Sequence, residues 1–207
     1  MVTDELISEI KNNDKVIKYI DIPLQHASNP VLKRMNRKGT GEEYLNLINR
    51  LKSEIKDIAI RSTFIVGFPG ETEEDYEVLK DFISKAKFTN CGFFAYSREK
   101  DTPSNKLDGH MPKKIKEKRV KALYQLQSEI SYENLQSYVG KTIKVICDGV
   151  DYDKQSFYGR AYFNAPDIDG RVYFSSTEDI NQGEFYNVLI EETDEYDLYG
   201  SVNNELT

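Results

Sequence analysis

Residues 61–76 read RSTFIVGFPGETEEDY and combine a strand, a tight turn and a helix start in one short stretch. The apolar run that ends at Val66 is typical of a buried strand. Thr72 is followed three residues later by Asp75, which matches the capping box that begins a helix, and the apolar residues that follow recur at helical intervals. The stretch therefore predicts a strand over residues 58–66 that leads through Gly-Phe-Pro-Gly into a helix.

The same alternation of strand and helix extends to both sides. Residues 16–24 form a strand-like apolar run, and a second capping box, Thr40 with Glu43, begins another amphipathic helix. A third strand-like run covers residues 91–96. Strand, helix, strand, helix, strand predicts parallel strands with right-handed crossovers, as in doubly wound sheets and α/β barrels. Three strands cannot close a barrel, so we expect an α/β half-barrel.

The pattern changes near residue 136. A charged helix is predicted for residues 113–136, and five short β-type runs separated by Asp, Gly and Asn follow it. These runs cover residues 142–148, 156–163, 171–175, 185–192 and 197–202. Asp169-Gly170 is a hairpin-turn signal. We therefore predict two domains, residues 1–136 and residues 137–207, the second a small all-β barrel of the OB kind.

The net charge of −7 divides unevenly at the same boundary. From Ser137 onward five basic and fourteen acidic residues give −9, which leaves +2 for residues 1–136. The apolar fraction of 39% is typical of a globular protein, and no apolar run is long enough to cross a membrane. We expect a cytoplasmic protein. Cys91 and Cys147 are the only cysteines, so no CxxC or CxxxCxxC spacing occurs, and both are expected to be buried thiols.

The turn after Val66 has the position of a ligand site, because α/β proteins bind ligands at the carboxyl ends of their strands. Gly67 and Gly70 would let the backbone approach a ligand closely. A phosphate loop is disfavoured, since Gly-Lys-Ser/Thr is missing and acidic residues already follow the turn. An ordinary strand-to-helix turn explains the same pattern equally well.

Polar residues also mark the other strand ends. Gln25 and His26 close the first strand, Tyr96 closes the third, and Arg61 precedes the apolar run of the second. Taken singly, each of these is more often structural than functional, and a satisfied loop histidine is the commoner explanation of His26.

Three longer stretches extend the interpretation. They are YIDIPLQHASNPVLKRMNRKGT (residues 19–40), IRSTFIVGFPGETEEDY (residues 60–76) and FFAYSREKDTPS (residues 93–104). In this order they resemble segments of the methylthiotransferase family of radical S-adenosylmethionine enzymes, and the acidic end resembles the TRAM domain of that family. The resemblance implies the C-terminal part of a radical-SAM (β/α) partial barrel followed by an OB-like TRAM barrel.

Two stretches bear on the branch of the family. APDIDGRVYF (residues 165–174) and DEYDLYG (residues 194–200) resemble the RimO branch, which methylthiolates an aspartate of the twelfth small-subunit ribosomal protein. The tRNA-modifying MiaB branch and a noncatalytic acidic docking module are the alternatives. A barrel at −9 repels polyanions and suits a basic protein partner, although an acidic surface can also serve solubility alone.

The resemblance also implies cofactors. Enzymes of this family use S-adenosylmethionine and two four-iron four-sulfur clusters, one of them held by a CxxxCxxC motif that this sequence lacks. We therefore expect a fragment that is inactive alone, with no catalytic residue and no metal ligand of its own. In the intact enzyme, reductive cleavage of S-adenosylmethionine would give a radical that abstracts hydrogen from the aspartate β-carbon before sulfur insertion.

Site residues follow from the resemblance together with position at the strand ends. Ile65 and Gly67, with Gly70 beside them, are expected to contact the adenine or ribose. Gln25 and Arg61 are expected to make polar contacts to the methionine or ribose part, and Tyr96 to face cofactor or substrate. For the partner protein, the expected contacts are loop carboxylates of the barrel: Asp151, Asp153, Asp194 and Glu195.

Overall fold

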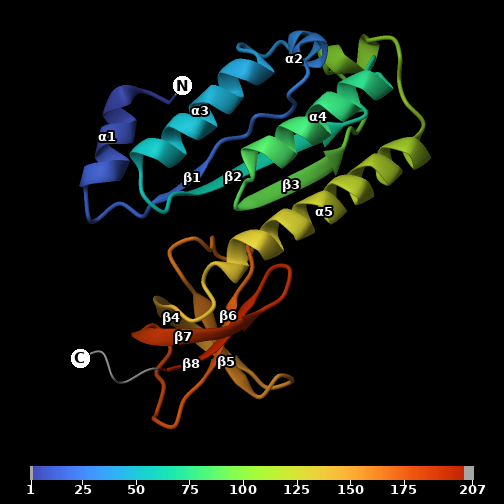
Figure 1. Ribbon diagram of the computed structural model, residues 1–207. Coiled ribbons are helices and arrows are strands. Elements are labelled where there is room, and N and C mark those ends of the chain that lie inside the picture. Colours follow the sequence, from blue (N-terminus) through green and yellow to red (C-terminus); the bar gives the residue numbers. More distant parts are fainter. Residues whose placement is uncertain (1, 203–207) are drawn as a thin grey trace. The chain divides into compact units, whose positions relative to one another are not determined.

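The computed structural model describes residues 2–202 as two compact units that divide in sequence between Gln127 and Ser128 (Figure 1). Residues 1 and 203–207, the outermost residues of the two predicted domains, lie outside the described part. The division falls within helix α5 (Lys113–Gln136), whereas the sequence pattern places the domain boundary after that helix. The two units are described separately below.

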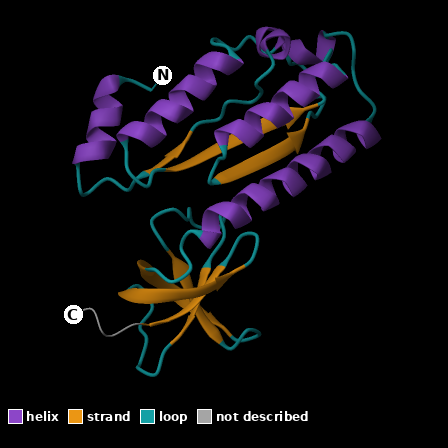
Figure 2. Ribbon diagram, in the orientation of Figure 1, coloured by secondary structure: helices purple, strands orange, loops and turns teal. Residues whose placement is uncertain are grey.

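The first unit contains a three-stranded parallel sheet in the order β1-β2-β3, which confirms the predicted α/β architecture (Figure 2). The strands are β1 (Tyr19–Asp21), β2 (Ala59–Val66) and β3 (Asn90–Ala95). β1 is much shorter than the predicted strand over residues 16–24, and after it the pairing register shifts by one residue, from Asp21 opposite Arg61 to Gln25 opposite Phe64. The chain rejoins β2 at Gln25, which forms an isolated parallel bridge with Phe64.

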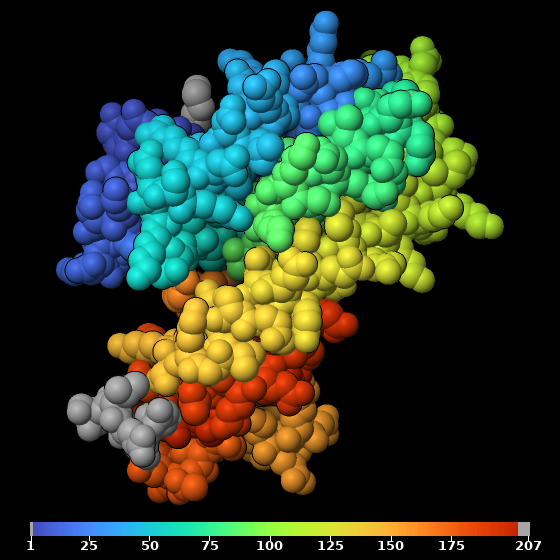
Figure 3. All heavy atoms as spheres, in the orientation of Figure 1, coloured from blue at the N-terminus to red at the C-terminus, as the bar shows by residue number. Residues whose placement is uncertain are grey.

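Both predicted capping boxes are present. Thr40 and Glu43 cap α3, and Thr72 and Asp75 cap α4, each through reciprocal side-chain and backbone hydrogen bonds. The helices of this unit before α5 are α1 (Asp4–Asn12), α2 (Asn29–Arg34), α3 (Gly41–Glu54), α4 (Glu73–Ala86) and the 3-10 helix η1 (Pro103–Lys106). The sequence reasoning above did not include α1. In the space-filling view α1, α3 and α4 form one continuous surface (Figure 3).

Successive side chains of β2 point to opposite faces of the sheet. Ile60, Ser62, Phe64 and Val66 are buried, whereas Arg61, Thr63 and Ile65, which alternate with them, are only half-buried. Phe64 packs against Phe82 of α4, with their ring centroids 6.1 Å apart, so the buried face is the one that the helices cover. Helix α5 lies beside β3, where the Phe93 N–H donates to the Tyr124 hydroxyl (3.3 Å).

The second unit is a closed five-stranded barrel in the order β4-β5-β6-β8-β7, as expected for an OB-like fold. Its strands are β4 (Thr142–Asp151), β5 (Ser156–Arg160), β6 (Val172–Ser175), β7 (Phe185–Thr193) and β8 (Leu198–Val202). The barrel core is apolar and includes Val145, Cys147, Val172, Phe174, Val188, Ile190 and Leu198.

The predicted hairpin turn at Asp169-Gly170 is wrong. β5 and β6 do pair antiparallel, but Gly159 pairs with Val172, so residues 161–171 form a long loop instead of a two-residue turn. The dipeptide closes that loop. The Asp169 carboxylate accepts a hydrogen bond from the Ala165 N–H (2.8 Å), and a Cβ on Gly170 would lie only 1.9 Å from the Tyr196 carbonyl oxygen.

Candidate functional site

The turn between β2 and α4 is tightly packed on its glycine side. Gly67 and Gly70 have positive φ (+71° and +84°), a conformation that side chains disfavour. A Cβ on Gly67 would lie 2.2 Å from Lys116 Cγ, and one on Gly70 would lie 2.7 Å from Arg34 Cζ. The glycines therefore make room for two long basic side chains of the chain itself, in addition to supplying the backbone conformation.

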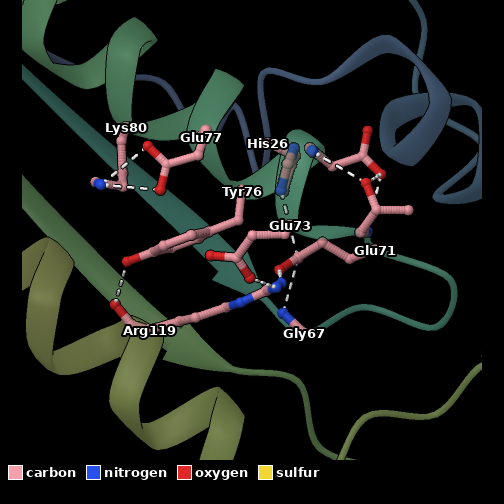
Figure 4. A network of polar contacts seen from close by, with 10 residues as sticks. His26, Gly67, Glu71, Glu73, Tyr76, Glu77, Lys80 and Arg119 are labelled. Atoms are coloured by element: carbon pink, nitrogen blue, oxygen red, sulfur yellow. Dashed lines mark hydrogen bonds and ion pairs between the residues drawn. The ribbon is translucent and has the colours of Figure 1, made fainter.

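A buried carboxylate holds the turn from the other side (Figure 4). Glu71 Oε2 accepts a hydrogen bond from the Gly67 N–H (2.7 Å), and Glu71 Oε1 accepts one from Nη1 of Arg119 in α5. The second guanidinium nitrogen, Nη2, lies 2.5 Å from Glu73 Oε2. Because the Glu71 side chain is fully buried, this pairing supplies the compensation that a desolvated charge requires.

Tyr76 completes the attachment of α5 to α4. The Arg119 guanidinium carbon lies 4.8 Å from the Tyr76 ring centroid, and the Tyr76 hydroxyl donates to the Arg119 carbonyl oxygen (3.1 Å). Burial raises the pKa of Tyr76 to about 12, so the phenol stays a neutral donor near pH 7. Burial alone would lower the pKa of Arg119, but hydrogen bonds to Glu73 and Glu71 outweigh it and raise that pKa.

His26 is fully buried next to this network. Its Nδ1 accepts a hydrogen bond from the Ser28 N–H (3.0 Å), which assigns the ring proton to Nε2, and Nε2 lies 3.4 Å from Glu71 Oε2. The preceding residue, Gln25, has φ +73°. Its backbone N–H donates to the Thr63 carbonyl oxygen, and its carbonyl oxygen accepts a hydrogen bond from the Ile65 N–H (2.9 Å each). The structure therefore ties the first strand end directly to the end of β2.

Tyr96 lies at the adjacent end of β3. Its N–H donates to the Val66 carbonyl oxygen (2.9 Å), its ring lies 5.2 Å from Phe68, and its carbonyl accepts a hydrogen bond from Lys116 Nζ (2.5 Å). Ile65 packs against the same small apolar cluster. The Tyr96 side chain is 8% exposed, and within the described residues its buried hydroxyl has no hydrogen-bond partner. An unsatisfied buried hydroxyl is unusual and suggests a missing partner.

The sheet face away from α3 and α4 carries the second group of candidate contacts. Arg61 shares this face with Thr63 and Ile65, and its Nη1 pairs with Asp21 Oδ2 (2.7 Å). From β3, Phe94 is 56% exposed and lies opposite Ile65 in register. The face therefore combines an ion pair, a hydroxyl and an aromatic ring.

The predicted cofactor residues fall into two places. Gln25, Ile65, Gly67, Gly70 and Tyr96 gather at the carboxyl ends of the strands. Arg61 shares the face of Ile65 but is separated from it by four residues, which corresponds to about 13 Å along the strand.

Sequence reasoning missed Glu71 as a buried anchor and Arg119 as its partner. The sequence contained one signal for the burial of Arg119. This residue lies four positions before the apolar Leu123, which is buried, so both side chains share one face of the helix.

In the barrel, the predicted partner-binding carboxylates lie in two loops. Asp151 and Asp153 belong to the β4–β5 hairpin, where Asp151 Oδ1 accepts hydrogen bonds from the N–H groups of Asp153 and Lys154 (3.1 Å each). Asp194 and Glu195 belong to the β7–β8 connection. Lys154 brings the loops together, since its Nζ lies 3.4 Å from the hydroxyl of Tyr199, which donates to Asp194 Oδ2 (2.7 Å).

The described residues offer no obvious metal site. Cys91 belongs to β3 and Cys147 to β4, in different units. In residues 2–202, no three His, Cys, Asp or Glu side chains are grouped so that they could hold a metal ion. In the same range no helix combines the length and apolar character needed to cross a bilayer.

Comparison with known proteins connects these features. Residues 1–83 match the radical SAM superfamily and residues 139–202 match the TRAM domain. Over 204 residues, 99% of the chain, the sequence is 48% identical to a ribosomal protein uS12 methylthiotransferase RimO from Acetivibrio thermocellus and to one from Carboxydothermus hydrogenoformans, covering 45% and 47% of those proteins. The chain belongs to the radical SAM methylthiotransferase family. It spans about half the length of the curated relatives that it matches.

Within this chain the superfamily match ends inside α4, at residue 83. Glu71 lies within the matched range, whereas Arg119 and Tyr96 lie beyond it. The Arg119–Glu71 ion pair thus attaches α5, which lies outside the superfamily match, to the turn that lies within it.

Proposed function

We propose that this chain supplies one wall of the S-adenosylmethionine pocket of a methylthiotransferase that modifies an aspartate β-carbon of ribosomal protein uS12. The observation that carries the proposal is the 48% identity over 99% of the chain to proteins with that name. S-adenosylmethionine, when bound beside an iron–sulfur cluster, supplies the radical chemistry of such enzymes. The roles of the residues here are to bind, to orient and to exclude water.

The residues at the strand ends fit a nucleoside. We propose that Ile65 gives an apolar surface for the adenine, that the Gly67–Gly70 backbone supplies polar contacts, and that the unsatisfied Tyr96 hydroxyl bonds to cofactor or substrate. Gln25, whose backbone is held against β2, and Arg61, farther along the same face as Ile65, are proposed to contact the methionine or ribose part.

The iron–sulfur clusters do not fit this chain by itself. Three thiolates are needed for a CxxxCxxC cluster, and the sequence contains only Cys91 and Cys147. We therefore propose that methylthiotransferase activity requires cluster ligands that this sequence does not contain, and that the chain alone is inactive. A cytoplasmic location, where ribosomal proteins are made, belongs to the same proposal.

For the TRAM barrel we propose docking of basic uS12 through its acidic loops, including Asp151, Asp153, Asp194 and Glu195. The net charge of −9 from Ser137 onward supports a cationic partner over a polyanion. The tRNA-modifying branch is the alternative, and it predicts tRNA binding with a steep salt dependence.

One titration tests the pocket and one tests the partner. Isothermal titration of S-adenosylmethionine into the chain should show binding that Ile65→Ala weakens at least fivefold and that the exposed control Val78→Ala leaves unchanged. No detectable binding, or equal affinity in both variants, would contradict the pocket and favour the noncatalytic docking module. Binding of uS12 and of tRNA, each at two salt concentrations, distinguishes the partners, since tighter binding of tRNA would contradict the uS12 proposal.

A further inference from the structure

The outer surface of the TRAM barrel carries three tyrosines side by side. Tyr158 of β5 pairs in register with Tyr173 of β6, which pairs with Tyr199 of β8. The Tyr173 and Tyr199 rings are stacked, with centroids 5.6 Å apart and planes at 14°, and Tyr158 lies 6.5 Å from Tyr173. Val172 and Phe174 are buried in the barrel core, so Tyr173 lies on the opposite side of β6, where it is only 7% exposed, while Tyr158 and Tyr199 are half-buried. We call these three residues the tyrosine row.

Two exposed basic side chains lie over the row. Lys154 Nζ is 3.6 Å from the Tyr173 ring centroid, and the guanidinium carbon of Arg171 is 4.6 Å from the Tyr158 centroid. Cations that pack on aromatic rings keep their long stems on apolar surface and their charge in water. The surface therefore presents the half-buried rings of Tyr158 and Tyr199 beside two positive charges. Aromatic and basic side chains are enriched at the centres of protein interfaces.

The position of the row within the barrel also suggests binding. OB-folds bind their ligands on the face of their second and third strands, between the loop after strand one and the loop after strand four. In this barrel those strands are β5 and β6, and those loops contain Lys154 and Asp194. The tyrosine row therefore occupies the face that this architecture uses for ligands.

A cavity of about 320 Å³ adjoins the row beside Tyr158. Its polar lining includes Arg160, Arg171, Asp148, Asp167 and Asp169. Arg160 is neutralised by Asp148, to which its Nε and Nη2 donate at 2.7 and 3.0 Å, and Arg171 lies over Tyr158. Asp167 and Asp169 leave the cavity with a net negative lining that suits a cationic side chain.

We infer that the tyrosine row and this cavity together form the docking surface for an extended basic segment of a polypeptide. This inference rests on the proposal that the barrel binds a basic protein, and it specifies the binding surface and the side-chain contacts. Aliphatic stems of the segment pack on the half-buried Tyr158 and Tyr199, while Lys154 covers Tyr173, and one Lys or Arg side chain enters the cavity toward Asp167. Single-stranded RNA also stacks on aromatic rows, but its phosphates would meet a segment that carries fourteen acidic and five basic residues from Ser137 onward.

The test compares variants of the full chain for binding to uS12 and to a single-stranded oligoribonucleotide. Tyr158→Ala should weaken uS12 binding at least tenfold, whereas Tyr132→Ala, a half-exposed tyrosine of α5, should change it less than twofold. Asp167→Asn should weaken uS12 binding about threefold. Tyr158→Phe, which keeps the ring, should bind nearly as the unmodified chain does, and it controls for folding of the barrel.

Three other binding results would contradict this inference. Equal uS12 affinity in Tyr158→Ala and the unmodified chain places docking elsewhere and overturns this inference while the proposed function stands. Absence of uS12 binding overturns both. Tighter binding of the oligoribonucleotide that Tyr158→Ala weakens and Asp167→Asn strengthens would identify the row as an RNA surface and overturn the choice of a polypeptide.

Discussion

Arg119 and Glu71 are separated by 48 positions in sequence and form a buried ion pair beside the turn that ends β2. The same Glu71 carboxylate accepts the Gly67 N–H, so one side chain connects α5 to the backbone of the turn. The Glu71 side chain is fully buried and that of Arg119 is 7% exposed, so the buried carboxylate depends on the arginine for compensation.

Replacement of the buried arginine should destabilise the chain strongly. Arg119→Met keeps an apolar stem but leaves Glu71 buried without a cation, which is expected to cost about 3–5 kcal/mol of unfolding free energy. Urea denaturation measures this cost. Arg50→Met is the matched control, because Arg50 forms ion pairs with Asp4 and Glu54 at the surface and should change stability by less than about 1 kcal/mol. Equal effects in the two variants would contradict the role given to Arg119.

The hydrogen bond from Gly67 to Glu71 should protect the turn from opening. Glu71→Ala removes the acceptor and is expected to speed hydrogen exchange at the Gly67 amide about tenfold, the equivalent of about 1.4 kcal/mol. Glu71→Gln retains an oxygen acceptor and should speed exchange less. Amide exchange followed by NMR gives both rates, and equally fast exchange of the Gly67 amide in Glu71→Gln and Glu71→Ala would show that the charge, not the acceptor, holds the turn.

Two glycines with positive φ should respond differently to alanine. At Gly183 a Cβ would meet no atom within 4 Å, so Gly183→Ala should cost only the backbone term, about 1 kcal/mol. At Gly67 the Cβ would also collide with Lys116 Cγ, and Gly67→Ala should cost about 1–3 kcal/mol more. Thermal or urea unfolding of both variants checks the order, which an equal loss would contradict.

Two neighbouring carboxyls of the barrel have pKa values that are shifted in opposite directions. Burial alone would raise the pKa of Asp194, but hydrogen bonds from the Tyr196 and Asp197 amides and from Tyr199 outweigh it and lower that pKa below 3.8. Burial, reinforced by the nearby Asp194, raises the pKa of Asp197 above 3.8. Carboxyl carbon shifts followed by NMR between pH 2 and about 6 should therefore show Asp197 protonating first as the pH falls.

The same shifts set the sign of their effects on stability. Asp194 contributes stability above its unfolded pKa of 3.8, and this contribution is lost as the pH falls through its lower folded pKa. Asp197 acts in the opposite sense, because its stabilising contribution is fully present below 3.8 and is lost as the pH rises through its higher folded pKa. Asp194→Asn should therefore reduce the acid sensitivity of the barrel, and unchanged sensitivity would contradict the assignment.

Much of the architecture could be predicted because its signals are local. The capping boxes at Thr40 and Thr72 involve residues three positions apart, and the apolar periods of the helices and strands span a few residues each. The early end of β1 escaped prediction, since the apolar pattern continues to Leu24 while the pairing register with β2 shifts by one residue before Gln25. Asp169-Gly170 wrongly predicted a two-residue hairpin turn, because the dipeptide closes the longer loop over residues 161–171.

The sequence by itself determined the family, the alternation of the main strands and helices and the acidic character of the barrel, because composition and short-range periodicity do not depend on how distant segments meet. Only the tertiary structure decided which charges are buried together and which tyrosines form a row. Helix packing brings Arg119 into contact with Glu71, and strand register places Tyr158 and Tyr199 on either side of Tyr173. The reason is physical, since desolvation and stacking depend on distances in space and not on separation along the chain.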